Sequence, residues 1–387
     1  MMTQMKNQHP PDHPRSPSPR KIAALAGLAI AAIVLVGVLA LLLFPDPCLN
    51  GFIKPRMMLA LAGAFPAYTL SIGDMHYDLT ENRLACDSVA VHAVDGSFSG
   101  SLGRFSVSGI DWIHLLRRGS ALPEDFARST LDAQEIMLTF PESQYTVLCQ
   151  RLQISVPDSA IVVDTLALHP AGNDEQLFEG SRFRMTRFRL LVPHAGARGF
   201  ACLELLNGKG YRTRSALIHE LDLDVLMNKD KPTARDTSHI PMPQEILSSI
   251  QGTLRVDSLR IVNGRLNYGE RFQVGSRPAL ITFDSIQFLA TGITNRQDPG
   301  AAIAIRAQGQ FMKAGIMTMS MTIPVASPGF SLQYSGRTTG YRACHSLHFI
   351  SHVDRSFLPI FGSCRLNSRR KSPASEITGT SIFICIL

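Results

Sequence analysis

Few residues of this chain have the types and spacing that chemistry would require. The densest group of potential metal ligands lies near the C-terminus and comprises Cys344, His345, His348, His352, Asp354 and Cys364. Its three histidines would share one face of a helix, as ligands of zinc or copper could. The β-branched and serine residues between them do not favour a helix, so a histidine cluster without a metal is the preferred interpretation. We expect no metal and no cofactor.

Motifs for catalysis are also missing from the sequence. A nucleophile elbow needs Gly-x-Ser-x-Gly, but residues 96–100 read GSFSG and place Phe98 at the central position. The sequence contains no phosphate-binding GxxxxGK[ST], no GxGxxG and no HExxH. No pair of carboxylates stands out from solvated strand faces. We therefore expect a protein that is not an enzyme.

The net charge of +7 invites a nucleic-acid interpretation, which the positions of the charges do not support. Residues 1–44 carry +3 and residues 337–387 carry +5, whereas residues 45–336 hold 27 basic and 28 acidic residues. One local basic run, formed by Arg182, Arg184, Arg187 and Arg189, is interleaved with Phe183 and Phe188. We interpret this run as a solvated strand edge, with contact to lipid headgroups as the alternative. We expect no nucleic acid as a partner.

Residues Ile22–Phe44 form an uncharged run of 23 residues. As a helix this run would be about 34 Å long, enough to cross a hydrocarbon core of about 30 Å. A Pro-Asp-Pro sequence follows it instead of the small residues of a cleavage site, so a single uncleaved span is favoured over a signal peptide. Four basic residues before the run place the N-terminus in the cytoplasm and the rest of the chain in the periplasm.

The rest of the chain alternates apolar and polar residues, which predicts strands with one buried face. Turns of hairpins are expected at Asp95-Gly96, Asn207-Gly208 and Asn263-Gly264. Only three short helices are indicated, over residues 52–64, 111–118 and 243–250.

One pattern recurs, in which an Asp-Ser or Asp-Thr pair separates two apolar-x-apolar triplets. Its copies are Leu84–Val91, Ile161–Leu168, Leu254–Ile261 and Ile281–Phe288, with a looser copy at Leu131–Leu138. In a regular strand the two triplets would face opposite sides of the sheet, whereas a bulge at the Asp-Ser step would bring both to one side. The irregular spacing of the copies excludes a solenoid of fixed period. We therefore expect a long antiparallel meander with one apolar face.

So few helices could not cover a sheet of this size. The sheet must then close as a sandwich or barrel, or curl into a trough whose interior contacts another apolar body such as lipid. An ordinary closed β-sandwich is the alternative that this argument leaves open.

Three segments resemble AsmA-like proteins, the group that includes AsmA and TamB. They are residues 95–119 (DGSFSGSLGRFSVSGIDWIHLLRRG), 250–272 (IQGTLRVDSLRIVNGRLNYGERF) and 279–295 (ALITFDSIQFLATGITN), and the likeness extends over about residues 22–336. It implies an inner-membrane-anchored, periplasmic β-rich protein with a taco-like groove for acyl chains, acting in phospholipid transport and outer-membrane biogenesis. Phospholipid, the inner membrane and envelope proteins are the partners so implied.

These observations predict a mainly β protein with an N-terminal transmembrane helix and an elongated antiparallel sheet curled into a groove. The expected regions are a cytoplasmic tail (1–21), the span (22–44), the periplasmic domain (45–336) and a divergent tail (337–387). Our hypothesis is that this last tail is not a native continuation, as a shifted reading frame would explain. The expected lipid-groove residues are Leu254, Val256, Leu259, Ile261, Leu266, Tyr268, Ile281, Phe283, Ile286 and Phe288. The alternative function is a membrane-tethered scaffold that binds outer-membrane proteins by strand-edge pairing.

Overall fold

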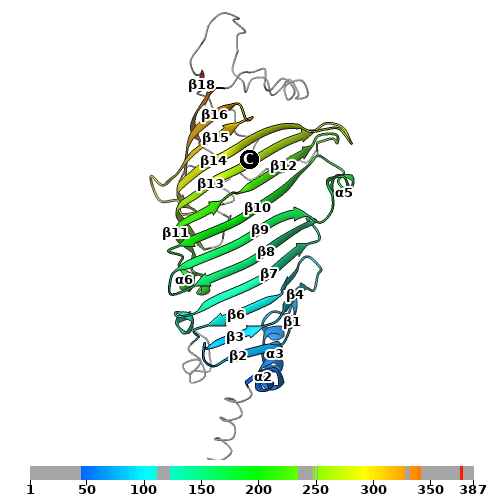
Figure 1. Cartoon of the computed structure of the whole chain (residues 1–387), viewed down its shortest axis with the longest axis vertical. Helices are drawn as coiled ribbons and strands as arrows, with labels where there is room; N and C mark the ends of the chain where they lie inside the picture. Colours follow the sequence, from blue (N-terminus) through cyan, green and yellow to red (C-terminus); the bar gives the residue numbers. More distant parts are fainter. Residues whose placement is uncertain are drawn as a thin grey trace, which may run out of the picture.

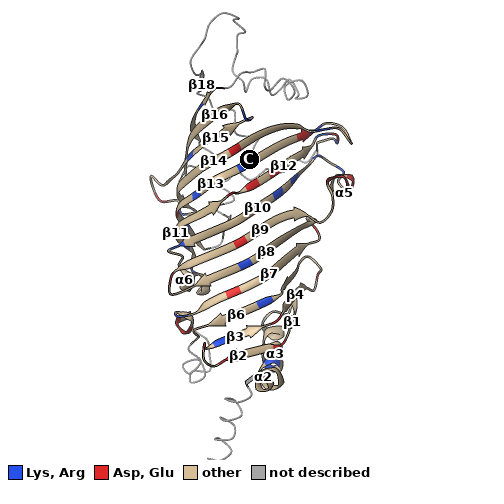
Figure 2. Ribbon diagram, in the orientation of Figure 1, with Lys and Arg blue, Asp and Glu red and all other residues tan. Residues whose placement is uncertain are grey.

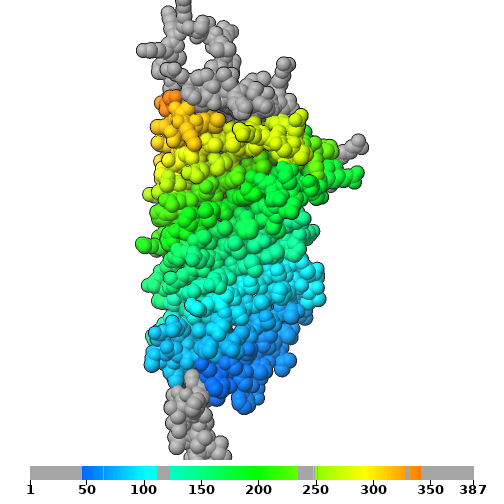
Figure 3. All heavy atoms as spheres, turned by 45° about the vertical axis from the view of Figure 1, so that its right-hand side comes forward, coloured from blue at the N-terminus to red at the C-terminus, as the bar shows by residue number. Residues whose placement is uncertain are grey.

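The computed structural model describes residues 45–110, 123–233, 247, 249–250, 252–326, 332–340 and 375–377. The chain is mainly β, with few and short helices, and the strands of the described residues form one large mixed sheet. The strands lie across the long axis of an elongated body (Figure 1). In the space-filling view the colours follow one another in bands along that axis, so the chain progresses from one end of the body to the other (Figure 3).

A helical segment precedes the sheet, as the sequence predicted over residues 52–64. It begins earlier than expected and consists of α2 (Pro45–Cys48), a π-helical turn η1 (Leu49–Ile53) and α3 (Lys54–Ala64). None of the described helices is long and apolar enough to cross a membrane. The expected span at residues 22–44 and the expected helix at 111–118 lie outside the described residues, as does most of the one at 243–250.

The first three long strands of the sheet are each broken once near the middle. The pieces are β1 (Tyr68–Ile72) and β2 (Met75–Asp78), β3 (Arg83–Cys86) and β4 (Val89–Ala93), and β5 (Ser99–Leu102) and β6 (Arg104–Ser108). One series of pairs runs β1–β4–β5–β7, and the other runs β2–β3–β6–β7. The two series therefore join at β7. The predicted Asp95-Gly96 hairpin is confirmed between β4 and β5, where Gly96 has a φ of +74°.

The middle of the sheet is an antiparallel meander. After a 3-10 turn, η2 (Pro123–Phe126), it comprises β7 (Thr130–Phe140), β8 (Tyr145–Ser155), β9 (Ala160–Pro170) and β10 (Met185–Arg198), with α5 (Asp174–Glu179) before β10. The next strand is again in two pieces, β11 (Gly210–His219) and β12 (Asp222–Asn228), and both pair with β10. Asn207-Gly208 is not a hairpin, because it joins the short helix α6 (Cys202–Leu206) to β11.

The last part of the sheet corrects the expectation of a wholly antiparallel meander. β13 (Thr253–Arg271) pairs parallel with β11 and β12, because the chain crosses from the end of β12 back to the start of β13. From there β14 (Ala279–Thr294), β15 (Ala302–Phe311), β16 (Gly315–Pro324), β17 (Gln333–Thr339) and β18 (Ser375–Ile377) follow in antiparallel order. The expected domain boundary at residue 336 falls inside β17.

A line of irregular backbone positions, called the seam below, crosses the sheet. It comprises Gly73-Asp74, Asp87-Ser88, Gly103, Glu135, Thr165, Glu220, Asn263 and Ser285. The last five have positive φ values between +50° and +57° within or between paired strands. These positions lie side by side across the sheet, as the pairs next to them show. For example, Asp164, which precedes Thr165, pairs with His194, and His194 pairs with His219, which precedes Glu220. Since irregular positions of this kind bend a strand and increase its twist, the seam is the line along which the strands that carry it are expected to bend.

The seam explains the recurring sequence pattern. The predicted bulge is confirmed at Ser285, where the register with β15 shifts by one residue. Thr165, and Glu135 in the looser copy, have positive φ values at the expected step, but β7 to β10 keep their register across them. The copy at residues 84–91 is broken between β3 and β4. The copy at residues 254–261 lies elsewhere, beside Gly292, whose φ is +73°. The expected turn at Asn263-Gly264 is wrong, because both residues lie inside β13 and Asn263 supplies the bulge of that strand instead.

Side chains of the helical segment cover the outer edge of β2. Asn50 accepts a hydrogen bond from the Met75 amide at 2.9 Å and donates one to the Met75 carbonyl at 2.9 Å. Asp46 accepts from the Tyr77 amide at 3.0 Å, and its other oxygen lies 2.9 Å from His76 Nδ1. His76 Nε2 lies 3.3 Å from Asp87. These contacts satisfy edge groups that would otherwise be open to another strand.

The docking of α2 on β2 is expected to weaken as the pH rises above about 6.5. The hydrogen bond to Asp46, followed by that to Asp87, raises the pKa of His76, so its stabilising contribution is full below the unfolded-state pKa and is lost as pH rises through the folded value. The bond to His76 lowers the pKa of Asp46, so the contribution of that carboxylate is lost only in acid, as pH falls through its folded pKa. Hydrogen exchange at the Tyr77 amide, corrected for its intrinsic pH dependence, should become faster between pH 6 and 9. In His76→Gln the corrected rate should not change over that interval, and a wild-type rate that stays constant would contradict the assignment.

Candidate functional site: the apolar face of the sheet

The strand register places Phe283 and Phe288 on the same face of the sheet, although they are five positions apart. β15 and β16 pair without any shift, so Ala307 and Phe311 share one face. Phe288 pairs with Ala307 and Phe283 pairs with Phe311, whose ring centroid lies 5.2 Å from that of Phe283. The bulge at Ser285 supplies the extra residue that makes this possible.

The other predicted groove residues lie on this same face. Ile261 pairs with Phe288, Leu266 with Phe283, and Tyr268 with Ile281. Leu259 pairs with Ala290, which is opposite Ile305 on β15. Val256 pairs with Ile293, which packs against the cluster of Ile303, Met321 and Ile323, and Leu254 lies two residues before Val256. Ile286 lies beside Gly264 and Gly309. The structure thus brings together all ten residues that the sequence singled out.

Two unbroken rows of apolar or glycine residues cross this face, one on each side of the seam. The first row is Leu70, Val91, Gly100, Leu138, Val147, Leu168, Leu190, Leu223, Leu266, Phe283, Phe311 and Gly315. The second row is Tyr77, Leu84, Val107, Leu131, Ile154, Ile161, Ala197, Ala216, Leu259, Ala290, Ile305, Met321 and Tyr334. Each residue in a row is the cross-strand partner of the next. The apolar face therefore runs from β1 and β2 to β16 and β17.

Most side chains on the apolar face are only half-buried. Of the predicted residues Tyr268 is buried, at 5% exposure, and the other nine are intermediate. The tightest cluster, Ile303 with Met321 and Ile323, also contacts Leu247 and Leu332 from outside the strands. Burial raises the pKa of the Cys86 and Cys149 thiols on this face, so they act as apolar lining rather than as nucleophiles.

Charged residues alternate in sign from strand to strand in the middle of the sheet (Figure 2). Each of the pairs below is adjacent in sequence to apolar-face residues, so its side chains point to the opposite face. Arg151 pairs with Asp132, and Asp164 lies 2.7 Å from His194 Nδ1. Arg265 lies 3.1 Å from Asp284 and 3.5 Å from Asp222. These pairs lie next to the seam. They make this face polar and solvated, in contrast to the apolar face.

A buried polar cluster, which sequence reasoning missed, lies where β12 and β13 end beside α5. Arg271 contacts Glu175, Asp230 and Asn228, and its guanidinium lies 4.7 Å from the Phe178 ring centroid. Glu270, which is fully buried, pairs with Lys229 at 2.7 Å and accepts from the Tyr268 hydroxyl at 2.9 Å. The sequence signal was the unusual Tyr-Gly-Glu-Arg end of an otherwise alternating strand. This cluster fixes α5 to the sheet where β12 and β13 end.

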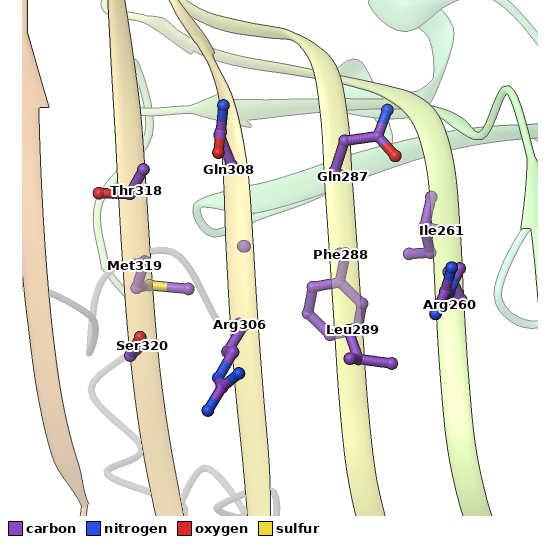
Figure 4. A pocket seen from close by; sticks show the side chains of 11 residues that line it. Arg260, Ile261, Gln287, Phe288, Leu289, Arg306, Gln308, Thr318, Met319 and Ser320 are labelled. Atoms are coloured by element: carbon purple, nitrogen blue, oxygen red, sulfur yellow. The ribbon is translucent and has the colours of Figure 1, made fainter.

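A shallow cavity of about 360 Å³ lies over β13 to β16 (Figure 4). Its lining includes two adjacent rows of outward-facing residues. These are Arg260, Leu289, Arg306 and Ser320, and Gln287, Gln308 and Thr318. Ile261, Phe288, Ala307 and Met319 lie between the two rows. Because consecutive side chains of a strand alternate between faces, these four contribute main chain to this cavity and side chains to the apolar face.

The other candidates that the sequence raised are structural or lie outside the described residues. Residues 96–100 form the β4–β5 hairpin, and the ligand group at 344–364 is not described. The described residues contain no cluster of three or more metal-ligating side chains. In the basic run Arg182, Arg184 and Arg189 are exposed, as expected. Arg187 is an exception, since it is 3% exposed and pairs with Asp174 and Asp224. The expected strand edge is wrong, because β10 pairs with strands on both sides. The chain matches no protein-family model and no curated protein sequence.

Proposed function

We propose that this chain binds phospholipid acyl chains on its apolar face, as an inner-membrane-anchored periplasmic protein of AsmA-like type that acts in envelope biogenesis without catalysis. The observation that carries the proposal is the pair of unbroken apolar rows, which run side by side for the whole length of the sheet. Acyl chains are linear and apolar, and a continuous strip of aliphatic side chains matches them along their length. Their transfer from water is favourable by about 0.8 kcal/mol per buried methylene group.

The seam supports the trough that this function requires. A flat sheet would leave its apolar face open to water, which is unfavourable for so large a surface. Irregular residues at one level of β7, β9, β13 and β14 favour bending of these strands along one line. The two apolar rows would then line the two sides of a trough whose bottom is the seam. Acyl chains in the trough would contact both rows.

The alternative, a scaffold that pairs with strands of other proteins, has less support from the sheet edges. Side chains of Asp46 and Asn50 occupy the edge groups of β2 at Met75 and Tyr77. At the other end, β17 pairs with β18 over Gly336 to Thr338. A strand added from outside would have to displace these contacts.

The test is the lipid content of the full-length chain after gentle purification. Mass spectrometry should find phospholipid bound to the wild type, and Phe283→Glu should lose most of it, because a carboxylate then lies on the apolar face between Leu266 and Phe311. Leu280→Glu is the matched control, since Leu280 lies on the same strand, faces the other side and is already 45% exposed. Wild-type protein without lipid, or equal loss in both variants, would refute the proposal. Capture of unfolded outer-membrane proteins by the lipid-free chain would instead favour the scaffold.

A further inference from the structure

The helical segment before the sheet exposes an apolar surface on the side that faces away from the sheet. Leu59 is 75% exposed, Phe52 68%, Phe65 57% and Ile53 47%. These side chains are among the most exposed large apolar residues of the described chain. Four such side chains within 14 residues, called the patch below, are more than a solvated helix needs and favour a binding surface.

The same segment is apolar on the side that packs on the sheet as well. Met57, Met58 and Leu61 are half-buried there, and α3 contacts β1. A helix that is apolar on both sides needs an apolar neighbour on each side. The sheet supplies only one of them, and no described residue covers the exposed side.

The residues near the patch and its place in the chain favour a lipid surface as the second neighbour. Lys54 and Arg56 are the charged residues between Asp46 and Asp74 in the sequence. Lys54 lies 3.8 Å from Asp74, and Arg56 is exposed beside the apolar side chains. Basic side chains beside exposed Phe and Leu are typical of helices that lie in the headgroup region of a membrane. The uncharged run 22–44 ends at the residue before α2, which places the patch next to the proposed span.

We propose that the segment from Phe52 to Phe65 lies in the outer leaflet interface of the inner membrane and seats the apolar face on the bilayer. This inference rests on the proposed membrane anchorage. The first apolar row begins at Leu70 on β1, directly after this segment (Figure 1). Asn50 and Asp46 bind the segment to β2, so its position in the lipid also fixes that of the sheet. Acyl chains leaving the bilayer would meet the start of the apolar face without crossing water.

The experiment uses tryptophan fluorescence in the full-length chain reconstituted into phosphatidylcholine vesicles with brominated acyl chains. Trp112 is the only tryptophan and is replaced by phenylalanine, after which Leu59→Trp provides the reporter. Val274→Trp is the matched control, because Val274 is 70% exposed and lies in the loop between β13 and β14, far from α3. We expect bromine to quench most of the emission at position 59 and little at position 274. Bromine near the headgroup end of the chains should quench more than bromine near the methyl end, because interfacial residues penetrate only about 5–10 Å.

Vesicle flotation of the same samples separates this inference from the anchorage on which it rests. If both variants float with the vesicles but position 59 is not quenched, the anchorage holds and the seating of α3 is refuted. If neither variant floats, the anchorage itself is refuted and the seating with it. Equal quenching at positions 59 and 274 would also refute the inference, because the whole body would then lie on the membrane.

Discussion

Replacing Arg271 with alanine is expected to lower the free energy of unfolding by about 3–5 kcal/mol. The guanidinium is 5% exposed and sits among Glu175, Asp230, Asn228 and the Phe178 ring. The side chain of Asp230 is only 9% exposed, and Asn228 is fully buried. Removal of the cation would leave a buried carboxylate without its partner, which costs far more than the ion pair contributes in water.

Arg265→Ala is the matched control for this prediction. Arg265 lies on the same strand and pairs with two carboxylates, but its side chain is 58% exposed. Its loss should cost at most about 1 kcal/mol, because solvent screens exposed pairs. Urea denaturation followed by circular dichroism measures both variants. Similar losses in the two would show that burial of the cluster around Arg271 does not govern its contribution.

Gly210→Ala is expected to destabilise the chain by about 3 kcal/mol and to loosen the parallel pairing of β11 with β13. Gly210 has a φ of +150°, and a Cβ there would lie 2.3 Å from the Thr253 carbonyl oxygen and 2.8 Å from its amide nitrogen. Both are main-chain atoms, so neither can rotate away. Gly210 and Thr253 are the first pair of the parallel ladder, and a shift there would propagate into the strand that carries Leu259 and Ile261.

Gly208→Ala tests whether the effect comes from close approach rather than from backbone conformation. Gly208 also has a positive φ, +65°, but a Cβ there would meet nothing within 4 Å. Only the conformational cost remains, about 1 kcal/mol. Hydrogen exchange of the β11 and β13 amides, together with denaturant midpoints, should show a larger change for position 210. Equal changes at both glycines would contradict the prediction.

Much of the fold follows from residue patterns that are local. Alternation of apolar and polar residues predicted strands, and Asp95-Gly96 predicted a hairpin that the structure contains, because each depends on a few consecutive residues. The face of Phe283 and Phe288 was also predictable, since their odd spacing and the intervening Asp-Ser pair require a bulge if both are to lie on one side.

Pairing between distant segments was not predictable in the same way. Asn263-Gly264 suits a tight turn, but β13 continues through it because β12 on one side and β14 on the other supply hydrogen-bond partners on both sides of the bulge. The parallel pairing of β11 and β12 with β13 depends on how the chain crosses back after Asn228, and no local pattern encodes that path. Likewise, the local pattern around Arg187 is that of a solvated basic run, whereas the fold brings Asp174 and Asp224 against its side chain.

The sequence by itself determined that this protein is a sheet with one apolar face, and which residues of β13 and β14 lie on it. Those properties follow from the period of two residues per strand repeat and from the bulges that reset it. Only the tertiary structure decided that the irregular positions of β7, β9, β13 and β14 align in one seam and that the apolar residues join into two rows from β1 and β2 to β16 and β17. The reason is that alignment across a sheet depends on the register between strands, which pairing and packing set and a single strand cannot.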